Sequence, residues 1–112
     1  MKYFVDEVQR KNSQTSCYFE FQKGHYHNVC WLEDSINIYI ELWDDFDLSE
    51  LFSQVVEDFD YYGLTTVNQA QWNKIVSIAY DEGNVWQKIV DEITPWVNEC
   101  FCNHSVFTIL GI

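Results

Sequence analysis

The stretch "INIYIELWDDFDLSELFSQVVEDF", residues 36–59, contains two different hydrophobic periods. Its first part alternates apolar residues with polar or aromatic ones, which is typical of a half-buried strand with one apolar face: Ile36, Ile38, Ile40 and Leu42. Its second part has apolar residues at helical spacing: Leu48, Leu51, Phe52, Val55, Val56 and Phe59. The stretch therefore predicts a strand followed by an amphipathic helix that ends at Gly63.

Upstream of this stretch the chain favours further strands. "CYFEF", residues 17–21, alternates with period two, and "HNVCWLE", residues 27–33, is rich in β-branched and aromatic residues. The segments "QKGHYH" and "EDS" supply the turns between them. We expect three strands in an antiparallel meander, while the first dozen residues fit a helix or a strand.

Downstream, the pattern favours helices. Asp47 and Glu50 have the spacing of a capping box, as do Asn68 and Gln71 at the start of a second helix. A third helix begins at about Val85, and Thr94-Pro95 predicts that it bends or restarts. The tail "SVFTILGI" favours a strand. We predict one α+β domain over residues 1–112: an N-terminal antiparallel β-meander, about three helices packed on one sheet face, and a short C-terminal strand.

The charge of the chain restricts its partners. It has 18 Asp and Glu against 6 Lys and Arg, a formal charge of −12. Between Lys23 and Lys74 there is no Lys or Arg. An acidic surface repels nucleic-acid phosphates and anionic membranes, so we expect neither as a direct partner. The complementary partner is a basic protein.

The composition favours a folded, cytoplasmic protein. A hydrophobic content of 47% is too high for a disordered acidic segment. The N-terminus lacks the apolar run of a secretory signal, and no stretch is long enough to cross a bilayer. In the cytoplasm the four cysteines are expected to be reduced thiols: Cys17, Cys30, Cys100 and Cys102.

One acidic surface is the predicted partner-binding site. On a helix starting after Asp47, a polar stripe would run opposite the apolar one, flanked by acids that precede the cap. Its members are Asp44, Asp45, Asp47, Glu50, Gln54, Glu57, Asp60 and Tyr61. Acids that only solvate a surface are usually mixed with Lys and Arg, which are missing here, and Tyr is frequent at interface hot spots. A purely solvating acidic face is the alternative.

In its size, its charge, its aromatic content and the run "DDFDLSELFSQVVEDFDYYG" (44–63), the chain resembles the small acidic immunity proteins of bacterial contact-dependent and polymorphic toxin systems. The resemblance implies one-to-one binding of a cognate toxin domain, often a nuclease, without catalysis. The alternative is an acidic inhibitor or nucleic-acid mimic that acts on another nucleic-acid-handling protein, as phage anti-defence proteins do. A small metal-binding module is a further alternative.

The metal-binding alternative depends on two clusters, His25-x-His27-x2-Cys30 and Cys100-x-Cys102-x-His104. Two such groups could supply four zinc ligands, but C-x-C is less typical of zinc sites than C-x2-C. Buried thiols and surface histidines are the alternative interpretation. With four glycines in the chain, no phosphate-binding loop is present either. We expect no metal, no cofactor and no catalytic residue.

Overall fold

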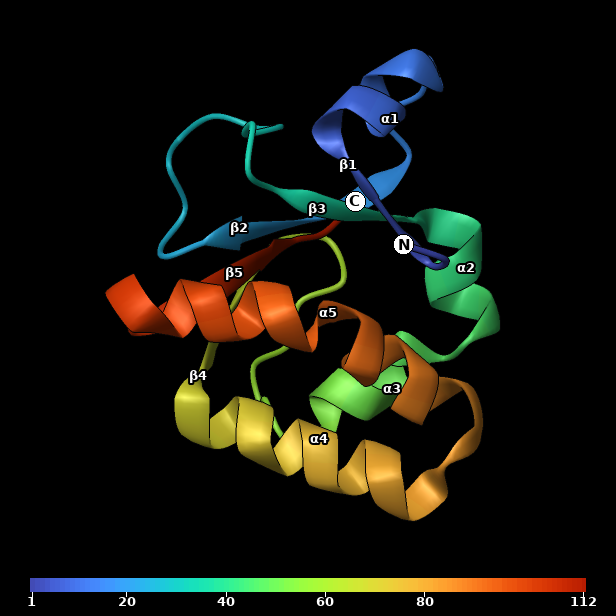
Figure 1. Ribbon diagram of the computed structural model, residues 1–112, viewed down its shortest axis with the longest axis vertical. Coiled ribbons are helices and arrows are strands. Elements are labelled where there is room, and N and C mark those ends of the chain that lie inside the picture. The colour runs from blue at the N-terminus through green and yellow to red at the C-terminus, as the bar shows by residue number, and fades with distance from the viewer.

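The computed structural model describes residues 1–112 as a five-stranded sheet with four of its five helices on one face (Figure 1). The strands are β1 (Phe4–Asp6), β2 (Tyr18–Lys23), β3 (Ile36–Tyr39), β4 (Leu64–Asn68) and β5 (Val106–Leu110). Their order in the sheet is β1-β3-β2-β5-β4, and every neighbouring pair is antiparallel. The predicted α+β class, with N-terminal strands and a C-terminal strand, is confirmed.

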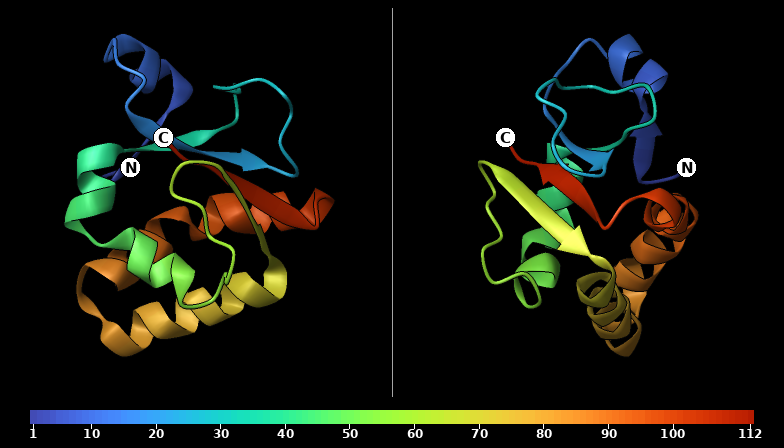
Figure 2. Two further views of the ribbon diagram at one scale, coloured as in Figure 1. Left: turned by 180° about the vertical axis from the view of Figure 1, so that it is seen from behind. Right: turned by 90° about the vertical axis from the view of Figure 1, so that its left-hand side faces the viewer.

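The helices are α1 (Glu7–Asn12), α2 (Ile40–Asp45), α3 (Leu48–Ser53), α4 (Gln69–Glu82) and α5 (Asn84–Asn103). Helices α2 to α5 lie on one face of the sheet, whereas α1 and the loop of residues 24–35 lie toward the other (Figure 2). We call these the helix face and the open face. None of the helices is long and apolar enough to span a membrane.

The hydrophobic core lies between the sheet and the helix face. Because side chains alternate along β2, Phe19 and Phe21 point into this core, while Glu20 and Gln22 point to the open face. The predicted middle strand at residues 27–33 is wrong. Instead β2 pairs directly with β3, and the intervening loop folds over the open face, where polar side chains of β2 hold it.

The strand that begins at Ile36 ends earlier than predicted, because Ile40 to Asp45 form helix α2. This change of conformation turns Trp43 into the core, where it is fully buried. A strand continued through residue 43 would instead place Trp43 on the face opposite Ile36, Ile38, Ile40 and Leu42. Its ring stacks on Phe19 at 4.1 Å between centroids and on Phe52 at 5.6 Å. Burial of this large aromatic surface favours the helix over a longer strand.

The helix predicted from residue 48 to residue 62 is also shorter. Helix α3 ends at Ser53, and the chain then turns so that Val56 is buried and Phe59 stacks on Trp43 at 6.0 Å. The predicted capping box at Asp47 is wrong, since this residue has a left-handed backbone (φ 54°) and makes no side-chain cap bond. Gly63 therefore ends a turn rather than a helix.

The capping box at the start of α4 is confirmed: Asn68 accepts from Gln71 N, and the Gln71 side chain accepts from Asn68 N. Helix α5 runs through Pro95 without restarting, and Thr94 donates to the Val90 carbonyl at 2.6 Å instead of capping a new helix. The ribbon changes direction near the middle of α5 (Figure 1), as a proline within a helix causes. The C-terminal strand β5 lies between β2 and β4, and β4 itself was not predicted.

Candidate functional site

The eight carboxylates of residues 41–60 are all exposed, and none forms an ion pair. The molecule contains two salt bridges, Arg10–Glu7 and Lys23–Glu99, both outside this segment. Elements α2, α3 and the segment that joins α3 to β4 lie next to one another on one side of the molecule (Figure 2). We call the acids on these elements the acidic surface: Glu41, Asp44, Asp45, Asp47, Glu50, Glu57, Asp58 and Asp60.

The structure places the predicted binding residues on three elements, so a single helical stripe is wrong. Asp44 and Asp45 end α2. Asp47 is the N-cap residue of α3, and Glu50 is on α3 with Gln54 as its C-cap. Glu57, Asp60 and Tyr61 lie beyond the helix, in the turns before β4. The sequence periodicity could not show this, because the apolar spacing continues to Phe59 although the helix does not.

Two of these residues meet across the surface. The Tyr61 hydroxyl donates to the Asp44 carboxylate at 3.0 Å, and the Tyr61 ring packs edge-on against Phe19 at 5.2 Å. Burial, followed by the hydrogen bond to Asp44 and its negative charge, raises the pKa of Tyr61 above 10. This contact joins α2 to the turn that precedes β4.

That turn is fixed to the end of β5. Gly111 N donates to the Gly63 carbonyl at 2.8 Å, and Ile112 N donates to the Tyr61 carbonyl at 3.0 Å. A Cβ on Gly111 would lie 2.1 Å from the Tyr61 carbonyl oxygen, so only glycine permits this approach. Within the turn, the Asp60 carboxylate accepts from Tyr62 N at 2.9 Å. Tyr61, which packs against Phe19, lies toward the helix face, while Tyr62 is 78% exposed and borders the open face.

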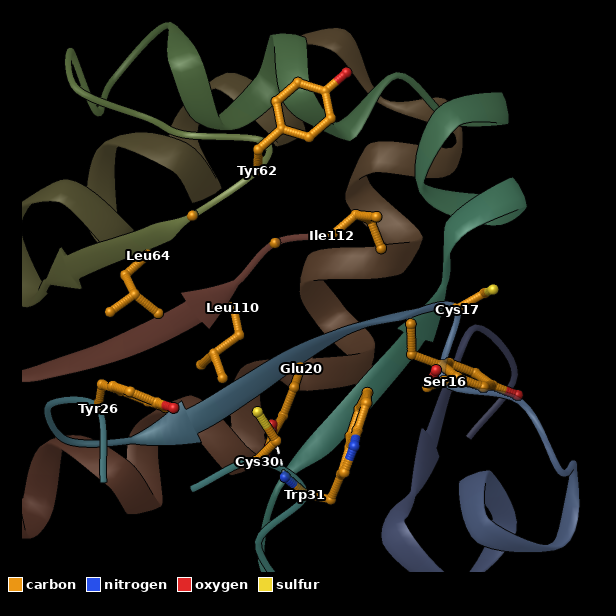
Figure 3. Close-up of a pocket in the computed structure, with 13 residues that line it drawn as sticks. Ser16, Cys17, Glu20, Tyr26, Cys30, Trp31, Tyr62, Leu64, Leu110 and Ile112 are labelled. Carbon is orange, nitrogen blue, oxygen red and sulfur yellow. Dashed lines mark hydrogen bonds between the residues drawn. The ribbon is translucent and has the colours of Figure 1, made fainter. Parts of the chain in front are cut away.

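On the open face, an apolar groove of about 660 Å³ crosses the end of the sheet. Leu64 and Leu110 are cross-strand neighbours on its floor, with Leu64 half exposed, and Tyr62 and Ile112 border one end. Figure 3 shows the loop residues Trp31 and Cys30 on the other side of β2 from these leucines. The groove was not predicted. The sequence feature that indicates it is an apolar residue, Leu64, on the exposed face of β4. This feature can be recognised only when the strand register is known.

The wall formed by residues 24–35 is held by buried polar groups of β2. The Glu20 carboxylate is 1% exposed and accepts four hydrogen bonds, from Trp31 N (2.8 Å), Leu32 N (3.0 Å), Ser35 Oγ (2.6 Å) and Gln22 Nε2 (3.1 Å). Trp31 has a left-handed backbone (φ 65°), which is strained for a bulky residue. Its ring also lies 4.0 Å from the Arg10 guanidinium. These contacts fix the Trp31 side of the groove.

The cysteine and histidine clusters do not form a metal-binding arrangement. Cys100 is buried beside β5, where its thiol donates to the Val106 carbonyl at 3.3 Å, whereas Cys30 is exposed in the groove. Burial raises the pKa of the Cys100 thiol. No group of three or more His, Cys, Asp or Glu side chains lies close enough to hold a metal ion.

A scan against protein-family models, a search of curated proteins and a search of solved structures each returned no significant match to this chain. The resemblance to immunity proteins therefore stays a prediction.

Proposed function

We propose that the protein is a non-catalytic inhibitor that binds a basic protein domain through its acidic surface, acting as an immunity protein against a bacterial toxin, in particular a nuclease. The observation that carries this proposal is the absence of any intramolecular ion pair among eight exposed carboxylates. Repulsion among these charges destabilises the fold, so a cation supplied by a partner explains their presence on one surface better than solvation alone does.

The chemistry of a nuclease fits this surface. The cleft of an enzyme that binds nucleic acid must be positive, and carboxylates placed in it would compete with phosphates. Long-range attraction between the two surfaces accelerates association, and buried aromatic contacts slow dissociation. The exposed Tyr62 and the half-buried Tyr61 lie next to the acids and can make such contacts.

The experiment is a capture from a lysate of the source organism at low and moderate salt, with three immobilised proteins. The first is the wild type. The second has Asp45, Glu50 and Glu57 replaced by Lys, because no side-chain hydrogen bond of these residues would be lost. The control has Glu33, Asp81 and Glu82 replaced by Lys, which changes the charge equally, from −12 to −6, but away from the acidic surface.

The proposal predicts that the wild type and the control retain one basic protein in stoichiometric amount, and that the acidic-surface variant does not. The retained protein should cleave nucleic acid, and added wild-type protein should stop the cleavage. If the retained protein is a host or defence enzyme instead of a toxin domain, the protein is still an inhibitor, but it is not an immunity protein. Equal retention by all three proteins would overturn the proposal.

A further inference from the structure

The two edges of the sheet differ. At the β1 edge, the Glu92 carboxylate of α5 accepts hydrogen bonds from Tyr3 N at 2.9 Å and Phe4 N at 2.8 Å, so this edge is covered. At the other edge, β4 pairs with β5 alone, and no other segment forms a backbone hydrogen bond with it. Only Asn68 N is satisfied there, by the Gln71 capping bond. Strand β4 is therefore the unprotected edge.

The hydrogen-bonding pattern between β4 and β5 shows which backbone N–H and C=O groups of β4 have no partner. The bond from Gly111 N to the Gly63 carbonyl fixes the pairing, and antiparallel ladders bond at alternate residues. Thr65 and Val67 therefore bond to β5. The backbone N–H and C=O groups of Leu64 and Thr66 point outward, which leaves two donors and two acceptors for another strand.

Natural edge strands usually carry a Lys, a Pro or a bulge that prevents pairing with other chains. The sequence of β4, "LTTVN", has none of these, and its pairing with β5 is unbroken. Leu64, Thr66 and Asn68 are exposed on the open face. A strand added here would place a side chain directly beside Leu64, next to the groove floor formed with Leu110.

The charge around this edge selects the partner. Glu57, Asp58 and Asp60 lie in the turns just before β4, and no basic residue follows until Lys74. A second copy of the chain would bring another charge of −12 to the same edge, which opposes self-association. A segment with Lys or Arg is attracted instead.

We infer that β4 binds an extended basic segment of the partner by strand addition, with an apolar side chain of that segment over Leu64 and the groove. This inference rests on the proposed function and names the second part of the same interface. Backbone hydrogen bonds would provide affinity, the groove would select the apolar side chain, and the acids would select the flanking cations.

The test uses a peptide of alternating Lys and Leu residues, and a control peptide of the same composition with all Lys residues first. Amide hydrogen exchange is measured by NMR. In the free protein, Leu64 and Thr66 should exchange fast and Thr65 and Val67 slowly. The alternating peptide should slow exchange at Leu64 and Thr66 at least about tenfold, as expected for new backbone hydrogen bonds, and the control peptide should not.

A matched pair of variants separates the contribution of the Thr66 backbone N–H to peptide binding from that of its side chain. Thr66→Pro removes the outward N–H without breaking the β4–β5 ladder, whereas Thr66→Ala changes the side chain only. The first should weaken peptide binding about tenfold and the second less than twofold, in line with one lost hydrogen bond. A peptide N-methylated at the residues that face β4 repeats the test on an unaltered protein, should Thr66→Pro fail to fold.

Binding that survives both Thr66→Pro and N-methylation overturns the inference. Protection of Leu64 that rises with protein concentration in the absence of peptide also overturns it, because it assigns the edge to a second copy. Measurements with the captured partner distinguish a failure of this inference from a failure of the proposed function. Loss of partner binding in the acidic-surface variant without protection of Leu64 in the wild-type complex would retain the function and reject strand addition.

Discussion

The Tyr61 hydroxyl and the Asp44 carboxylate, 17 positions apart in the sequence, are joined by a hydrogen bond of 3.0 Å. Through this bond the end of α2 holds the turn that carries Tyr62, whose ring lies 4.9 Å from that of Tyr61. The acidic surface and the groove on the open face therefore share one structural element. A change at Tyr61 should affect both.

Tyr61→Phe should reduce stability by about 0.5–1 kcal/mol at neutral pH, because one hydrogen bond at the surface is lost. Burial and Asp44 raise the pKa of Tyr61 above 10 in the folded protein, so the neutral phenol stabilises the fold. That stabilisation is complete below pH 10 and is lost as the pH rises through the folded-state pKa.

Urea unfolding between pH 7 and pH 11 checks this prediction. The alkaline loss of stability should be smaller in Tyr61→Phe than in the wild type. Tyr62→Phe is the matched control, since the Tyr62 hydroxyl makes no hydrogen bond and its side chain is exposed. An equal alkaline loss in wild type and Tyr61→Phe would contradict the role given to the Asp44 contact.

Gly111→Ala should destabilise the protein by about 2–3 kcal/mol, as overpacking against rigid atoms does. The new Cβ would meet the Tyr61 carbonyl oxygen at 2.1 Å and its carbon at 2.7 Å, and backbone atoms cannot rotate away. Gly63→Ala is the comparison. Its Cβ would meet the Asp60 carboxylate at 2.4 Å, which can move at the loss of its bond to Tyr62 N.

Thermal or urea unfolding of the two glycine variants should therefore rank Gly111→Ala as the less stable. The opposite order would show that the turn does not depend on its close approach to β5.

Glu20→Gln should loosen the loop of residues 24–35. An amide can accept fewer of the four hydrogen bonds that the buried carboxylate receives, and the unsatisfied donors should cost about 2–3 kcal/mol. Ser35→Ala removes one of these bonds and should cost about 1 kcal/mol.

The rate of limited proteolysis measures directly how often the loop of residues 24–35 opens. Cleavage within residues 24–35 should be fastest in Glu20→Gln, intermediate in Ser35→Ala and slowest in the wild type. If the Glu20 variant resists cleavage as well as the wild type, the carboxylate is not what fixes the Trp31 wall of the groove.

Local patterns in the sequence predicted the elements whose conformation they determine. The alternation in β2, the Asn68–Gln71 capping box and the C-terminal strand are examples, and together with the change of period they indicated the α+β class. Trp43 shows where such patterns fail. Its burial against Phe19 and Phe52 depends on long-range packing, which overrides the strand periodicity from Ile40 onward.

The candidate site also has features that the sequence could predict and features that it could not. The charge of residues 41–60 is a property of composition, so the exposed acids could be predicted. The contact between Asp44 and Tyr61, the groove at Leu64 and the free edge of β4 arise from strand order and register, which no local pattern determines. Glu20 is similar, since its burial depends on a loop that was predicted to be a strand.

The most direct measurement is the equilibrium affinity of the captured basic partner for three proteins: the wild type, the acidic-surface variant with Lys at positions 45, 50 and 57, and the control with Lys at positions 33, 81 and 82. Isothermal titration at two salt concentrations provides it. Because three carboxylates that pair with the partner are replaced, the acidic-surface variant should bind the partner at least about 100-fold more weakly than the wild type. The control should bind it less than about threefold more weakly. Equal losses in both variants would mean that net charge alone attracts the partner, and would contradict a binding site on α2, α3 and the turn before β4.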